Sequence, residues 1–102
     1  GGRRNARVVI DHLKAFRREP KYTDMDQTYV RRVIDELQQG NVPSNRVKRL
    51  LDALQGIMDP LKVLAILRRE MPEQILQEDE QHDRPEYPVE VILSAYLQRN
   101  AA

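Results

Sequence analysis

Apolar residues recur between residues 4 and 71 at steps of three and four, the spacing of one face of an α-helix. This pattern predicts four helices, over residues 4–18, 24–39, 44–55 and 60–71. Few runs of β-branched residues and only four glycines occur, which argues against a β-sandwich or a β-barrel. The sequence therefore predicts an all-α fold, a compact bundle of four to five helices.

The first two segments carry recognisable start and stop signals. Asn5 can cap the first helix, and Pro20 ends it because the residue before a proline is disfavoured in the α conformation. Thr23 and Asp26 have the spacing of a capping box at the start of the second helix. Gly40 suits the left-handed residue that ends many helices.

The third and fourth segments form a helical hairpin with a tight corner. Ser44 or Asn41 can cap the third helix, and Gly56 is placed to close it. Asp59 and Pro60 then supply an acidic N-cap and a proline at the first helical position. Apolar residues cover more than half of the circumference of the fourth helix, so we expect it to be the most buried of the four.

The pattern weakens after Pro72. Residues 73–77 can add a single turn, and residues 78–88 are acidic and rich in proline, which predicts a mobile acidic loop. Apolar residues in 89–98 fit a helix and a strand equally well. Because four helices precede this segment and no other strand is available for pairing, we favour a helix.

The inward stripes predict the hydrophobic core. It comprises Val9, Leu13, Val33, Ile34, Leu37, Leu50, Leu51, Leu54, Leu64, Leu67 and Ile92. A chain of 102 residues has the size of one domain or of a fragment, since domains commonly hold roughly 100–150 residues. Gly1 and Gly2 fit a cleavage remnant or a boundary cut, so we expect residues 1–102 to be a single helical domain excised from a larger protein.

The net charge of +1 conceals two parts of opposite sign. Residues 1–71 hold 15 Lys and Arg against 9 Asp and Glu, whereas residues 72–102 hold 2 against 7. Such an asymmetry predicts either an anionic partner or pairing between the two parts of the chain itself. The sequence does not rank these two alternatives.

Three basic residues near the start of the third helix, Arg46, Lys48 and Arg49, are the candidate nucleic-acid contacts. Several other arginines, namely Arg17, Arg18, Arg68 and Arg69, lie near helix C-termini, where the helix dipole favours cations without any ligand. The dipole disfavours cations at a helix start, so the cluster in the third helix is the better candidate for binding phosphates.

The sequence contains no recognisable catalytic or metal motif, and we expect neither an enzymatic activity nor a cofactor. His12 is expected to be a surface or boundary histidine rather than a ligand. His82 lies in an acidic stretch that can be imagined as a weak cation site, but the spacing and glycine of an EF-hand are absent, which favours a solvated loop. No apolar run approaches the roughly 18 residues of a membrane span, and the absence of cysteine fits a reducing, cytoplasmic setting.

Three apolar stretches carry a resemblance to a known family. They read DPLKVLAIL at 59–67, MPEQIL at 71–76 and VEVILSAYL at 89–97. Together they resemble a helical accessory region of bacterial helicase-like ATPases of the Snf2/superfamily 2 type. The sequence departs from that family at Ala95, where an acidic residue is expected.

The resemblance implies that the ATPase lobes lie elsewhere in a longer protein and that this chain neither binds nor hydrolyses ATP. It implies a helicase-associated domain that contacts DNA or RNA through Arg46, Lys48 and Arg49, or docks on the ATPase lobes, without catalysis of its own. The alternative is a protein–protein interaction module that binds a partner helix in an apolar groove.

Overall fold

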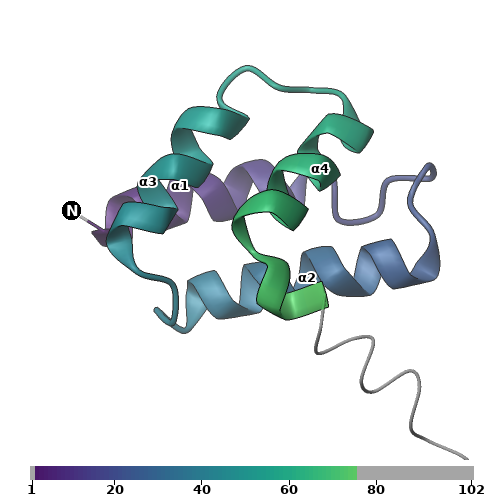
Figure 1. Cartoon of the computed structure of the whole chain (residues 1–102). Coiled ribbons are helices and arrows are strands. Elements are labelled where there is room, and N and C mark those ends of the chain that lie inside the picture. Colours follow the sequence, from purple (N-terminus) through teal and green to yellow (C-terminus); the bar gives the residue numbers. More distant parts are fainter. Residues whose placement is uncertain (1, 76–102) are drawn as a thin grey trace, which may run out of the picture.

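Four amphipathic helices pack around one core in a closed ring. The computed structural model describes residues 2–75, and its helices are α1 (Gly2–Lys14), α2 (Asp24–Gln38), α3 (Ser44–Leu54) and α4 (Pro60–Glu70). Both α1 and α4 pack on α2 and on α3, so that each helix has two neighbours (Figure 1). The predicted all-α bundle is confirmed.

A further helical turn begins directly after α4. Residues 72–75 are helical, which confirms the turn predicted at 73–77 as far as Ile75. The predictions for the loop at 78–88, for the element at 89–98 and for the core residue Ile92 lie outside the described residues.

The predicted boundaries of α2 are confirmed in atomic detail. The Oγ1 of Thr23 accepts a hydrogen bond from the Asp26 amide at 3.0 Å, and Asp26 Oδ2 accepts one from the Thr23 amide at 3.1 Å. At the other end Gly40 has a φ of 75°, and its amide donates to the Leu37 carbonyl. The next amide, that of Asn41, reaches back to Glu36 at 3.0 Å, so the helix ends in a Schellman motif.

The first helix differs from its prediction at both ends. It begins at Gly2, so Asn5 lies inside it and is not its cap, and it ends at Lys14 rather than at residue 18. After Lys14 the backbone bonds change to the tighter three-residue pattern, for example from the Phe16 amide to the Leu13 carbonyl at 2.9 Å. In this tighter turn Phe16 is buried in the core, and the helix ends well before Pro20.

The cap predicted for α3 is wrong. The N-cap position is Pro43, which offers no side-chain acceptor, and neither Ser44 nor Asn41 caps the helix. The side chain of Asn45 instead accepts a hydrogen bond from the Arg46 amide at 2.9 Å. One first-turn amide is thereby satisfied from within the helix itself.

The corner between α3 and α4 follows the prediction. Gly56 has a φ of 75°, a conformation that residues with a Cβ atom rarely adopt. Asp59 then accepts a hydrogen bond from the Leu61 amide at 3.0 Å, and Pro60 opens α4 at the first helical position. The corner is therefore specified almost entirely by local residues.

The core draws side chains from all four helices and from the link between α1 and α2. Its buried apolar members are Val9, Leu13, Phe16, Tyr22, Tyr29, Val30, Val33, Ile34, Leu37, Val47, Leu50, Leu54, Val63, Leu64, Leu67 and Met71. Every predicted core residue among the described residues is present except Leu51, which is only half-buried at the edge of the core.

The fourth helix is not the most buried, contrary to the prediction. It buries Val63, Leu64 and Leu67, whereas α2 buries a longer stripe. Because α4 packs mainly against α2 and α3, one stripe of it is covered. Leu61, an apolar residue of α4 outside this buried stripe, faces outward with 55% of its surface exposed.

Two tyrosines hold the ends of α4. The Tyr22 hydroxyl donates a 2.7 Å hydrogen bond to the Pro60 carbonyl, and the Tyr29 hydroxyl donates a 3.0 Å bond to the Met71 carbonyl. Burial, with nearby carboxylates adding to it, raises the pKa of Tyr22 to about 12. The hydroxyl therefore keeps its donor proton throughout the neutral range.

The prediction that His12 is a boundary histidine is confirmed. The residue is half-buried, and its Nε2 atom lies 3.0 Å from the Ile57 carbonyl, to which it donates as the N–H tautomer. Its ring lies 5.5 Å from that of Phe16. His12 thus joins the end of α1 to the corner between α3 and α4.

Leu50 and Leu51 provide a direct test of which face of α3 is inward. Leu50→Ala should lower the free energy of unfolding by about 2–5 kcal/mol, because it leaves a cavity in a fully buried site. Leu51→Ala, the matched substitution at the next residue, should cost less than half as much. Urea denaturation of both variants measures the difference, and equal losses would contradict this orientation of α3.

Candidate nucleic-acid interface

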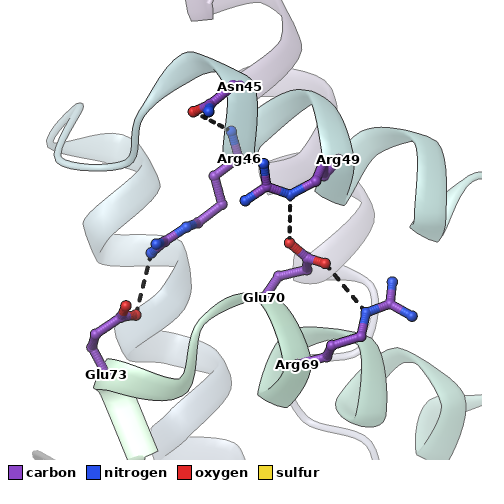
Figure 2. Close-up of polar contacts among 6 residues, drawn as sticks. All are labelled: Asn45, Arg46, Arg49, Arg69, Glu70 and Glu73. Carbon is purple, nitrogen blue, oxygen red and sulfur yellow. Dashed lines mark hydrogen bonds and ion pairs between the residues drawn. The ribbon is translucent and has the colours of Figure 1, made fainter.

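The three predicted phosphate contacts do not share one environment. Arg46 and Arg49 lie one helical turn apart and reach toward the end of α4 (Figure 2). Lys48 is exposed and has no hydrogen bond or ion pair with any residue between 2 and 75. The structure therefore brings two of the three cations together and leaves the third apart.

Arg46 is paired with a carboxylate from the turn that follows α4. Its Nη1 atom donates to Glu73 Oε2 at 3.2 Å. Glu73 belongs to the acidic part of the chain, so this contact realises one of the two alternatives that the charge asymmetry predicted, pairing within the chain.

Arg49 shares one carboxylate with a second arginine. Its Nε atom donates to Glu70 Oε1 at 2.9 Å, and the Nε atom of Arg69 donates to the other oxygen at 3.2 Å (Figure 2). The Glu70 side chain is only 13% exposed, while those of Arg49 and Arg69 are 54% and 63% exposed. One carboxylate thus lies between two guanidinium groups and leaves one positive charge uncompensated.

This arrangement changes the acidity of Glu70. The hydrogen bond from Arg49 lowers the pKa of the Glu70 carboxyl, and the bond from Arg69 adds to this effect, while partial burial opposes it. The Glu70 carboxyl is therefore ionised at neutral pH.

The helix dipole is not the only interaction available to the arginines at the end of α4. Arg68 donates to Asp26 Oδ1 at 2.8 Å, so the carboxylate of the α2 capping box also joins α2 to α4. Arg69 has Glu70 as its partner. Both residues therefore have specific partners beyond the general effect that the sequence suggested.

The α3–α4 face keeps a positive charge after its ion pairs are counted. Arg46, Arg49 and Arg69 pair with Glu70 and Glu73, and three cations against two carboxylates leave a net charge of +1 in this cluster. Exposed ion pairs contribute only about 0–1 kcal/mol, so a phosphate can compete with these carboxylates for the arginines. The sequence alone could not identify the two carboxylates, because they come from a different helix and from the turn after it.

The described residues contain neither a candidate metal site nor a membrane-spanning helix. Between residues 2 and 75 no cluster of three or more His, Asp or Glu side chains is placed to hold a metal ion, and His82 lies outside this range. No helix in the same range is long and apolar enough to cross a membrane.

Comparison with known proteins does not assign the chain to a family. No protein-family model, curated protein or solved structure matches it.

The lowered pKa of Glu70 predicts a pH-dependent contribution to stability. Because its folded pKa lies below the unfolded value of about 4.3, ionised Glu70 stabilises the fold above that pH, and the contribution is lost as the pH falls through the folded pKa. Glu70→Gln should therefore lower the free energy of unfolding by up to about 1 kcal/mol at neutral pH. The deficit should shrink in the acid range.

The control for this measurement is Asp52→Asn, which removes an exposed α3 carboxylate that has no ion pair among residues 2–75. Chemical denaturation at several pH values measures both variants. A Glu70→Gln deficit that stays constant from neutral to acid pH would show that the ion pairs do not stabilise the fold.

Proposed function

We propose that this chain is a non-catalytic helical accessory domain of a helicase-like ATPase, and that it contacts nucleic-acid phosphates or docks on the ATPase lobes. The α3–α4 face supports this proposal, because its three paired arginines outnumber their two carboxylate partners and leave a net charge of +1. The resemblance of the apolar stretches at 59–67 and 71–76 to Snf2/superfamily 2 accessory regions supports the helicase context.

Of the three predicted contacts, Lys48 is the one that can bind a phosphate without losing a partner. It is exposed and needs to give up no partner among the described residues, whereas Arg46 must exchange Glu73 for the ligand. Arg49 and Arg69 lie between these two cases, because they share Glu70 and keep more than half of their side-chain surface exposed. Among these residues we therefore expect Lys48 to contact a phosphate most readily.

A second candidate function has its own observation. A partly apolar groove lies between α1 and α3. It is lined by Val8, Val9, Leu51 and Leu54 together with His12, Gln55 and Gly56, and Val8 is 48% exposed. Such a groove can accept the apolar face of a partner helix. Val8→Asp should abolish binding of that kind and leave salt-dependent nucleic-acid binding unchanged.

A salt titration tests the phosphate contact. The wild-type chain should bind a short duplex at low salt, with an affinity that falls steeply as the salt concentration rises. Lys48→Glu should reduce the slope of this dependence by about one, the value for one lost phosphate contact. Fluorescence anisotropy with a labelled duplex measures both affinity and slope.

Arg31→Glu is the charge-matched control, since Arg31 is an exposed residue of α2 and lies outside the α3–α4 face. It should leave the slope unchanged. If the wild-type chain binds neither duplex nor single strands at low salt, direct nucleic-acid contact is wrong, and docking on ATPase lobes or binding of a partner helix remains.

A further inference from the structure

A groove runs along α1 on the side that faces the corner between α2 and α3. It encloses about 840 Å³ and is lined on the α1 side by Arg3, Arg7 and Lys14. The half-buried side chains of Ala6 and Ile10 also line it, and the opposite wall includes Gln38 and Ser44. A lining of both polar and apolar residues, with cations along one edge, is suited to a ligand that carries several negative charges.

The three cations form a single stripe. At 100° per residue, Arg3, Arg7 and Lys14 lie within about 40° of one another around the axis of α1. At 1.5 Å per residue, Arg3 and Arg7 are separated by about 6 Å along the axis, and the whole stripe is about 16 Å long. A nucleic-acid strand advances about 3.4 Å per phosphate, so about five phosphates fit within this length.

The stripe differs from the α3–α4 face in its charge balance. Arg3, Arg7 and Lys14 are exposed, and none of them has a hydrogen bond or an ion pair with another residue of the range 2–75. The groove contains one carboxylate, Asp11, which lies within the range of neither Arg7 nor Lys14 for an ion pair. The cations of this groove are therefore available without the loss of an existing contact.

The basic surface continues beyond the end of α1. Lys14 also lines a second hollow, together with Arg17, Arg18 and one carboxylate, Glu19. No aromatic side chain occurs among the described residues that line either hollow, so the stacking platform typical of single-strand binding is missing here. Contact with backbone phosphates alone is the mode by which proteins bind duplexes without reading their sequence.

We propose that the α1 groove is the principal nucleic-acid contact of this domain, and that it binds the phosphate backbone of a duplex without sequence preference. This inference rests on the proposed function, but it assigns the contact to a surface other than Arg46, Lys48 and Arg49. The three cations of the stripe contribute about three phosphate contacts, which corresponds to a salt slope of about −2.7.

The test compares charge variants of the full chain. Arg3→Glu combined with Arg7→Glu should reduce the salt slope for a mixed-sequence duplex by about two, while Arg31→Glu leaves it unchanged. Arg3→Gln combined with Arg7→Gln should give the same change in slope, which separates the loss of contacts from added repulsion. Circular dichroism should show all variants folded, because these side chains have no partners among the described residues.

Each alternative result has a definite meaning. If only Lys48→Glu alters duplex binding, the α1 groove is not the contact, although the proposed function stands. If a single strand of equal charge binds more tightly than the duplex, or an acidic peptide competes as well as the duplex does, the assigned ligand is wrong. If the wild-type chain binds no nucleic acid at low salt, both this inference and the phosphate contact of the proposed function fail.

Discussion

Mutual burial of one apolar stripe per helix is the constraint on which the rest of this structure depends. The helices α3 and α4 are eleven residues each, and isolated helices shorter than about 12–15 residues are marginal in water. They persist because Leu50 and Leu67 are completely removed from solvent in a core that all four helices share. Loss of that core would therefore unfold the helices, and the surfaces that they form would be lost with them.

Polar contacts then select one arrangement among those that the core allows. Hydroxyl groups of Tyr22 and Tyr29 hold the two ends of α4, and the ring of His12 holds the corner that precedes it. All three bonds end on backbone carbonyls: that of Ile57 in the corner, that of Pro60 in the first turn of α4 and that of Met71 directly after α4. Together they join α1, the link after it and α2 to the two ends of α4 and to the corner before it, while Glu70 and Glu73 join the end of α4 to arginines of α3.

The two basic surfaces of the domain, the α3–α4 face and the α1 groove, differ in whether their cations already form ion pairs within the protein. On the α3–α4 face, cations stabilise the packing of two helices by pairing with carboxylates. Along α1, cations of the same type form no ion pair among the described residues, although the carboxylate of Asp11 lies in the same groove. A count of basic residues would rank the two surfaces alike, whereas their contacts favour α1 as the surface for an anion.

The sequence by itself determined the features that depend on neighbouring residues. The helical periodicity, the capping box of Thr23, the left-handed glycines at 40 and 56 and the Asp59 cap all act within a few residues, and all were predicted correctly. The end of α1, the exposure of Leu51 and Leu61, and the carboxylate partners of Arg46 and Arg49 depend on which helices become neighbours. Only the tertiary structure decided these features, because they join residues of different helices whose contact no local pattern records.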